Sequence, residues 1–218
     1  MKRLTLFAGH YGSGKTNLAV NYAKMLKKSG CDVIVADLDI VNPYFRTKDS
    51  EAQLAENGIE LICSEFANTN LDIPSLPKNL YRVVNDKKFR AVMDIGGDDA
   101  GAVALGRFAP FINEEKDYEM IFVANFFRPL TRNAEEAFEV MKEIEAVSSM
   151  KFTAIVNNSN LGRDTTAEDI VSTFAETEKL SSLSSLPVLF TSCEKSLYEN
   201  VKSSDAEIFP LELQSKLF

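Results

Sequence analysis

Eight consecutive residues near the amino terminus have the types and the spacing that bind phosphate. The run Gly9-His10-Tyr11-Gly12-Ser13-Gly14-Lys15-Thr16 fits the pattern G-x-x-x-x-G-K-S/T. Glycines allow such a loop to turn its backbone amides inward, toward phosphate oxygens. The lysine supplies an ammonium for the β- and γ-phosphates, and the threonine hydroxyl can ligate Mg²⁺. The predicted nucleotide contacts are Gly9, His10, Tyr11, Gly12, Ser13, Gly14, Lys15, Thr16 and Asn17.

The sequence on both sides of this loop has the context that the motif requires. Residues 4–8 are an apolar run typical of a strand, and residues 16–26 repeat apolar side chains at helical spacing. A helix that begins at Lys15 would direct the positive end of its dipole at the same phosphates. Strand, glycine-rich loop and helix together predict a nucleotide site in which Lys15 has a catalytic role.

Two aspartates end the next predicted strand, which covers residues 31–39. Asp37 and Asp39 are two residues apart, so their side chains would point to the same side of an extended chain. One carboxylate could hold Mg²⁺ through water while the other orients or deprotonates the attacking water. We assign Asp37 to the metal and Asp39 to the water, which makes Asp39 a predicted catalytic residue. The alternative is that one of them only caps a turn or a helix.

Asp94 ends a third apolar strand, over residues 89–94, and is followed by Ile95-Gly96-Gly97. Magnesium bound with a nucleotide takes oxygen ligands, usually one or two carboxylates together with water and phosphate. The two glycines would leave room for the γ-phosphate. The predicted metal ligands are Thr16, Asp37 and Asp94.

Strands and helices alternate along the whole chain, which predicts a three-layer α/β/α sandwich with a mostly parallel sheet. In such a sheet, ligands bind beyond the carboxyl ends of the strands, where the residues above are placed. We expect one P-loop nucleotide-binding domain over residues 1–218, with helices over 102–111, 133–147 and 166–178. Residues 181–185 are predicted to be a linker and 188–190 the final strand. The tail from Glu207 is predicted to pack back onto the domain.

Composition limits the classes of function. The chain has 218 residues, 45% hydrophobic and 26% charged, as in soluble globular proteins. Its net charge of −8 disfavours a nucleic-acid partner. Three widely spaced cysteines and one histidine exclude a metal site built from those residues. No apolar run approaches the ~20 residues of a membrane span, so we expect a cytoplasmic protein without a stable membrane anchor.

The phosphate loop, the Asp37-x-Asp39 strand end and the Asp94-x-Gly-Gly strand end resemble the MinD/ParA-like branch of P-loop ATPases. The resemblance implies binding of ATP or ADP with Mg²⁺, and a nucleotide-dependent switch that acts through a homodimer or a protein partner. In that branch, a lysine follows the first glycine of the loop and reaches the partner subunit's nucleotide. His10 occupies that position here, so the cross-subunit lysine mechanism is not implied.

The same resemblance implies a role for Asn157, because its strand end often carries an asparagine that reads the adenine edge. A side-chain amide has the donor and the acceptor that this edge requires. The adjacent Asn158 leaves the choice between the two open. The guanine-reading motif N/T-K-x-D is absent, since residues 157–160 contain neither Lys nor Asp. The sequence therefore favours ATP over GTP.

The source of a catalytic positive charge stays open in the sequence. Arg46, Arg107 and Arg128 lie in or just after predicted loops, and each could act as an arginine finger. Residues 42–46 directly follow the aspartate pair and are the candidate switch or partner-binding segment.

Two alternatives to a switch ATPase also stay open. The first is a metabolic enzyme of the dethiobiotin synthetase or cobyrinate synthase type, in which ATP activates a substrate carboxylate. Its pocket would be built from residues 64–79 and from the loops after Asp94 and Asn125. The second is a nucleotide-binding module with little or no hydrolysis.

Overall fold

In the part of the chain that the structure describes, a parallel sheet of eight strands forms the centre of the molecule. The computed structural model describes residues 1–38, 50–63, 78–97, 99–202 and 206–213. The strand order is β3-β2-β4-β1-β5-β6-β7-β8, and every neighbouring pair is parallel. The strands are β1 Leu4–Ala8, β2 Val33–Asp37, β3 Glu60–Ile62, β4 Arg90–Asp94, β5 Tyr118–Ala124, β6 Ala154–Asn157, β7 Val188–Glu194 and β8 Ile208–Leu211.

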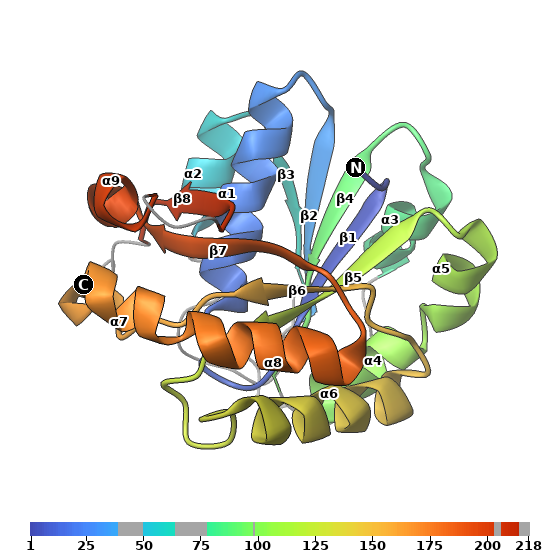
Figure 1. Ribbon diagram of the computed structural model, residues 1–218. Helices are drawn as coiled ribbons and strands as arrows, with labels where there is room; N and C mark the ends of the chain where they lie inside the picture. The colour runs from blue at the N-terminus through green and yellow to red at the C-terminus, as the bar shows by residue number, and fades with distance from the viewer. Residues whose placement is uncertain (39–49, 64–77, 98, 203–205, 214–218) are drawn as a thin grey trace, which may run out of the picture.

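Helices cover both faces of the sheet (Figure 1). One face packs against α1 (Lys15–Lys28) and α2 (Glu51–Glu56). The opposite face packs against α3 Tyr81–Asn85, α4 Asp99–Gly106, α5 Ala109–Glu115, α6 Ala134–Ser148 and α8 Phe174–Ser184. Around Cys193 and the end of the sheet lie α7 (Ala167–Ser172) and α9 (Tyr198–Val201). Short 3₁₀ turns are η2 Lys78–Leu80, η3 Gly162–Asp164 and η4 Lys195–Leu197. The predicted three-layer α/β/α architecture is confirmed.

The apolar character of β1 follows from this double covering. All five of its residues are buried. Leu4, Leu6 and Ala8 belong to the core under α4 to α6, whereas Phe7 belongs to the core under α1. A strand with a helix layer on each face is apolar on both faces, which is why the run showed no polar alternation.

Two predicted helices are each split in the structure. The segment predicted as one helix over 102–111 forms α4 and α5, and Pro110 lies in the first turn of α5, where its missing N–H costs nothing. The segment 166–178 divides at Thr173, whose hydroxyl donates to the carbonyl of Ile170 at 2.7 Å.

The prediction of a linker over residues 181–185 is wrong, because α8 continues to Ser184. Serine is a weak helix former, since its hydroxyl competes for backbone groups. Here the hydroxyls bond within the helix instead: Ser182 donates to the Glu178 carbonyl at 3.0 Å and Ser184 to that of Leu180 at 2.8 Å.

The carboxy-terminal segment forms an eighth strand that the sequence did not predict. In β8, Pro210 removes one backbone donor, which an edge strand tolerates. The chain after β8 also pairs with α1: Asn21 donates to the Glu212 carbonyl at 3.0 Å and accepts from its N–H at 2.9 Å. The prediction that the tail packs back onto the domain is confirmed for the described residues.

Candidate functional site

The parallel sheet brings the polar strand ends together at one edge. Asp37 is in register with Asp94, and Asp94 is in register with Phe7, just before the phosphate loop. Ala124 is in register with Asn157 on the other side of β1. Residues far apart in the sequence are thus neighbours beyond the carboxyl ends of the strands, where ligands of such sheets bind.

Two glycines of the phosphate loop stand where a side chain would not fit. Gly14 caps α1 with a φ of 86°, and a Cβ there would lie 2.3 Å from Nδ2 of Asn158. A Cβ on Gly9 would lie 2.7 Å from the carbonyl oxygen of Val123 in β5. The glycines in the motif are therefore required by close packing of the loop on β5 and β6.

Asn158 fastens the loop to the sheet. Its side chain is buried; Nδ2 donates to the Ser13 carbonyl at 2.6 Å, and Oδ1 accepts from the Ser192 hydroxyl at 2.5 Å. This asparagine therefore joins the phosphate loop to β6 and β7. These two hydrogen bonds give Asn158 a structural role, and which of Asn157 and Asn158 contacts a base stays a prediction.

Two of the three side chains predicted to hold Mg²⁺ are in contact. The Thr16 hydroxyl donates to Oδ2 of Asp94 at 2.6 Å, and Asp94 is 1% exposed. Asp37 is buried on the neighbouring strand. Asp39 lies outside the described residues.

This donor set fits a magnesium ion that is shared with phosphate. No group of three or more His, Cys, Asp or Glu side chains that could hold a metal occurs among the residues that the structure describes. Mg²⁺ at nucleotide sites uses one or two protein carboxylates, and phosphate and water complete its shell. Thr16 and Asp94, with Asp37 beside them, are oxygen donors of that kind.

Lys15 lies within the loop rather than in solvent. It is 6% exposed, and its ammonium donates to the His10 carbonyl at 3.1 Å. A Cβ on Gly97 would be 2.7 Å from Lys15 Nζ and equally close to the Tyr11 nitrogen. The chain after β4 thus packs directly on the loop, and the Gly97 position requires glycine.

His10 and Tyr11 form the outer part of the loop. Nδ1 of His10 is 2.9 Å from the Tyr11 carbonyl, and the Tyr11 side chain is 52% exposed. The tyrosine side chain thus lies open to solvent on the outside of the phosphate loop.

Asn157 is occupied within the structure. It is fully buried; Nδ2 donates to the Thr173 hydroxyl at 2.8 Å, and Oδ1 accepts from the Ser159 N–H and hydroxyl at 3.1 and 2.7 Å. Its predicted contact with an adenine edge stays a prediction, and it would require these hydrogen bonds to be exchanged.

The structure separates the three arginines that the sequence left equivalent. Nε of Arg128, in the loop after β5, donates to the Gly12 carbonyl at 2.7 Å. Arg107 is exposed after α4, a helix that starts at the carboxyl edge of the sheet and runs away from it. Arg46 lies outside the described residues. Among the described arginines of this set, only Arg128 touches the phosphate loop.

An apolar pocket of about 370 Å³ adjoins the loop. It lies between the phosphate loop, α4, α6 and the segment after Arg128. Its lining residues are His10, Tyr11, Gly97, Ala102, Leu130, Val140, Glu143, Ile144 and Val147. The Leu130 side chain is 59% exposed. A second molecule bound here would therefore lie beside the phosphate loop.

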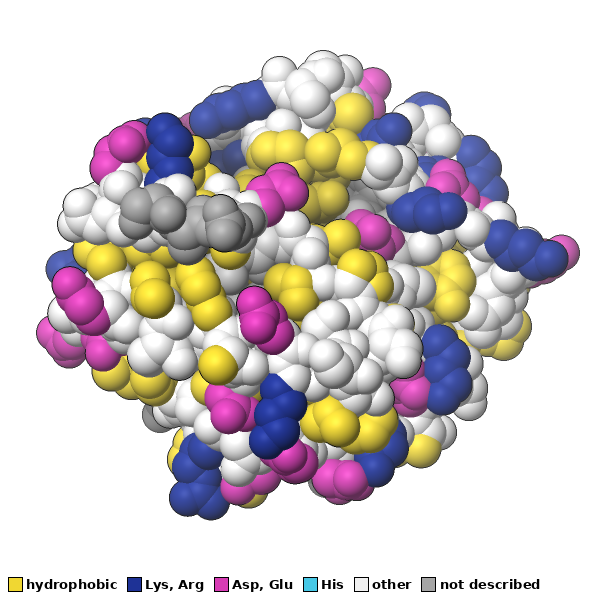
Figure 2. All heavy atoms as spheres, viewed as in Figure 1, with side chains coloured by type: hydrophobic (Ala, Val, Ile, Leu, Met, Phe, Trp, Pro, Cys, Tyr) yellow, Lys and Arg dark blue, Asp and Glu magenta, His cyan; other side chains and the backbone are white. Residues whose placement is uncertain are grey.

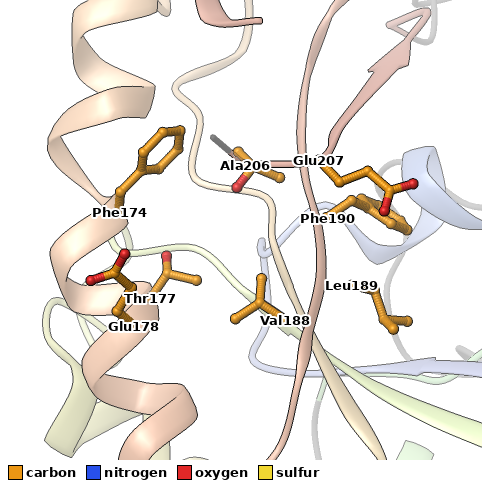
Figure 3. Close-up of a pocket in the computed structure, with 9 residues that line it drawn as sticks. Phe174, Thr177, Glu178, Val188, Leu189, Phe190, Ala206 and Glu207 are labelled. Atoms are coloured by element: carbon orange, nitrogen blue, oxygen red, sulfur yellow. The ribbon is translucent and has the colours of Figure 1, made fainter. Parts of the chain in front are cut away.

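A second pocket, of about 430 Å³, is remote from the loop (Figure 3). Thr177 of α8 and Val188 of β7 face each other across it, with Phe174 and Glu178 on the helix side. Val188 begins β7, so this end of the pocket lies toward the amino edge of the sheet, opposite the phosphate loop. The described residues do not connect this pocket to the phosphate loop.

Charge is mixed over the visible surface. Figure 2 shows acidic and basic side chains interspersed on one face of the described residues, where no large basic area is present. No helix in the described parts of the chain has both the length and the apolar character that crossing a membrane requires.

Solved structures share this architecture. Cell division protein FtsY from Thermotoga maritima superposes with a TM-score of 0.64 at 15% identity, over 87% of this chain and 60% of that one. FtsY from Mycoplasma mycoides gives 0.63 at 16% identity, over 88% and 61%. The signal recognition particle receptor FtsY from Elizabethkingia anophelis, in complex with GDP, gives 0.53 at 15% identity, over 88% and 57%.

No family model and no curated protein matches the chain. This chain spans about 60% of the length of the FtsY structures that it resembles. At these identities the likeness establishes the fold, which is the α/β fold of P-loop NTPases.

Proposed function

We propose that this chain is a Mg²⁺-dependent P-loop ATPase of the MinD/ParA-like type, without the signature lysine, whose nucleotide state controls a protein partner. The observation that carries the proposal is the 2.6 Å hydrogen bond between the Thr16 hydroxyl and Asp94. It joins the start of α1 to the end of β4 and supports the assignment of these two side chains as oxygen ligands of a nucleotide-bound Mg²⁺.

The remaining residues of the loop have matching roles. The amides of residues 11–16 and the amino end of α1 would receive the phosphates, and Lys15 would neutralise the β- and γ-oxygens. A bound Mg²⁺ would supply further charge neutralisation. Asp39 would orient the water that attacks the γ-phosphate in line, so that water and ATP give ADP and phosphate.

Two observations point to different nucleotide bases, guanine and adenine. The fold is similar to that of an FtsY solved with GDP, which favours GTP. The residues after β6 favour ATP, because 157–160 contain no carboxylate to accept hydrogen bonds from guanine. We therefore propose ATP. A smaller dissociation constant for GTP than for ATP would overturn this choice, but not the proposal that the loop binds phosphate.

Lys15→Ala tests the nucleotide site. A ligand that binds only the folded state at 100 times its dissociation constant stabilises the fold by about 2.7 kcal/mol. We expect ATP with Mg²⁺ to raise the thermal midpoint of the wild-type protein and to leave that of Lys15→Ala unchanged. Lys142→Ala, on the exposed face of α6, is the control and should respond as wild type does. An equal midpoint shift in Lys15→Ala would contradict the assignment.

The pocket beside the loop supports a second candidate, an ATP-dependent enzyme that activates a substrate carboxylate. Its volume of about 370 Å³ suits a small molecule, and it is lined by Gly97 and Leu130, from the loops after Asp94 and Asn125. Phosphate release separates the two functions. The switch ATPase releases phosphate from ATP alone, whereas this enzyme releases it only after a carboxylate substrate is added.

A further inference from the structure

Arg128 is held against the phosphate loop by a built turn. Asn125, which directly follows β5, is fully buried, and its carbonyl accepts from the Arg128 N–H at 3.2 Å and from the Thr131 hydroxyl at 2.6 Å. The Asn125 Oδ1 accepts from the Phe127 N–H at 3.1 Å. The turn closes with the Thr131 N–H on the Arg128 carbonyl at 3.1 Å. The arginine is therefore fixed at its backbone on both sides.

The same turn is anchored to the neighbouring strand. The Phe126 N–H donates to the Ser159 hydroxyl at 3.0 Å, and Asn125 Nδ2 donates to the Asn160 carbonyl at 3.3 Å. Both partners follow β6, beside the asparagine that holds Ser13. The phosphate loop and the Arg128 turn thus share one support.

The side chain of Arg128 uses one of its five donors on the loop. Nε reaches the carbonyl of Gly12, where the backbone turns with a φ of 74°. Gly12 presents its carbonyl to the arginine, and its amide is one of those expected to face phosphate. Arg128 forms no ion pair with any residue that the structure describes, so its charge is not neutralised there.

Neighbouring basic side chains are placed differently. Arg132, at the end of the same segment, is exposed and bonds to Glu136 at 3.3 Å. A guanidinium next to a loop that binds polyphosphate, with several donors left over, has the geometry to contact the phosphates.

We propose that Arg128 is a phosphate-contacting residue of this site that acts within its own chain and supplies positive charge to the terminal phosphates of the nucleotide. The inference rests on the proposed nucleotide function. It gives the loop a second cation besides Lys15 and requires no lysine from another subunit. In this arrangement, Nε keeps the Gly12 carbonyl while the terminal guanidinium nitrogens bond to phosphate oxygens.

The test compares Arg128→Gln and Arg128→Lys with the control Arg132→Gln. Dissociation constants are measured for ADP and for a non-hydrolysable ATP analogue, each with Mg²⁺, and the melting temperature is measured without nucleotide. We expect Arg128→Gln to weaken binding of the triphosphate about tenfold or more, because hydrogen bonds to charged groups contribute about 1.5–3 kcal/mol. Diphosphate binding should change less than about threefold. Arg128→Lys, which keeps the charge, should fall between, and Arg132→Gln should match wild type.

Each other outcome has a definite meaning. If wild-type protein binds neither nucleotide, the proposed function fails before Arg128 is tested. If wild type binds and Arg128→Gln keeps the ratio of triphosphate to diphosphate affinity, the role of Arg128 is wrong. Equal weakening of both nucleotides together with a lower melting temperature would mean that Arg128 only supports the loop, which also overturns the proposal. Should Arg128→Gln fail to fold, the same ratio in Arg128→Lys decides.

Discussion

At the scale of single residues, the site depends on glycines, whose lack of a Cβ leaves room for neighbouring atoms. The hydrogen of Gly97 leaves space that Lys15 Nζ and the Tyr11 backbone occupy. Gly101, within α4, is similarly crowded, since a Cβ there would lie 2.5 Å from the Cα of Gly96. Glycine at position 97 therefore allows a close approach to the phosphate loop, and glycine at position 101 allows α4 to pack on Gly96.

Gly97→Ala should weaken nucleotide binding about tenfold or more, because the new methyl group must displace the loop backbone or Lys15. The matched control is Gly106→Ala at the end of α4, where the nearest atom to a Cβ is 3.5 Å away, an ordinary contact. Titration with a fluorescent ATP analogue measures both. Wild-type affinity in Gly97→Ala would show that the loop moves aside at no cost.

Residue patterns predicted the loop and its ligands but not its supports. The motif formed by Gly9, Gly14, Lys15 and Thr16 can be recognised in the sequence, because phosphate binding restricts both the residue types and their spacing. The bond from Arg128 to Gly12 joins residues 116 positions apart, and it exists only because β1 and β5 are neighbours. The spacing of residues in the sequence does not indicate which strands are neighbours in the sheet.

At the scale of elements, an ion pair secures α5 to the start of the sheet. Glu115, in the last turn of α5, bonds to Arg3 before β1 and to Lys87 before β4. The Arg3 and Glu115 side chains are each 9% exposed, and Arg3 also donates to the Val83 carbonyl at 2.9 Å. Burial raises the pKa of Glu115, whereas the hydrogen bonds and charges of Arg3 and Lys87 lower it. Together the lowering effects are larger, so the pKa lies below the ordinary 4.5.

Glu115→Gln should lower the free energy of unfolding by about 3 kcal/mol, because it leaves the buried charge of Arg3 uncompensated. A carboxylate with a depressed pKa stabilises the fold above its unfolded pKa, and this stability is lost as the pH falls through the folded value. The variant should therefore lose less stability than wild type below about pH 4.5.

Urea unfolding at pH 7 and at pH 3 to 5 measures both effects. Glu139→Gln is the control, since its exposed pair with Lys142 contributes about 0.5 kcal/mol or less. An acid limb in Glu115→Gln as steep as that of wild type would contradict the assignment of this linkage to Glu115.

Element boundaries show where sequence reasoning was limited. Alternation of apolar runs predicted the layers, because burial on both faces of a sheet imposes that pattern. The end of α8 was missed because serine propensity favours a turn, whereas the Ser182 and Ser184 hydroxyls here bond to the preceding turn of the helix. Strand β8 was missed because Pro210 opposes a strand except at an edge.

At the scale of the molecule, the first helix and the last strand hold each other. The Asn21 side chain, 8% exposed, makes two hydrogen bonds to the backbone of Glu212 and donates a third to the Asn17 carbonyl at 2.8 Å. Phe209 of β8 lies near Tyr22 of α1, with ring centroids 6.3 Å apart. The helix that begins at the phosphate loop is therefore packed against the far end of the chain.

Asn21→Ala should destabilise the fold by about 2 kcal/mol, because the two hydrogen bonds to the Glu212 backbone are lost and each contributes about 1 kcal/mol. Lys24→Ala removes the ion pair to the exposed Glu212 carboxylate and should cost less than about 1 kcal/mol. Chemical denaturation of the two variants provides the comparison. Equal stabilities would show that β8 does not depend on this pair.

The central place of β1 has a consequence for the order of folding. β1 is made before both of its neighbours in the sheet, β4 and β5, which come much later in the chain. The phosphate loop further requires Asn158 to hold Ser13. Contacts of such sequence separation close slowly, because the intervening chain must first be ordered. The phosphate loop can therefore take its final position only after β4, β5 and the chain following β6 have been made, so binding of the proposed nucleotide would report that these later strands are in place.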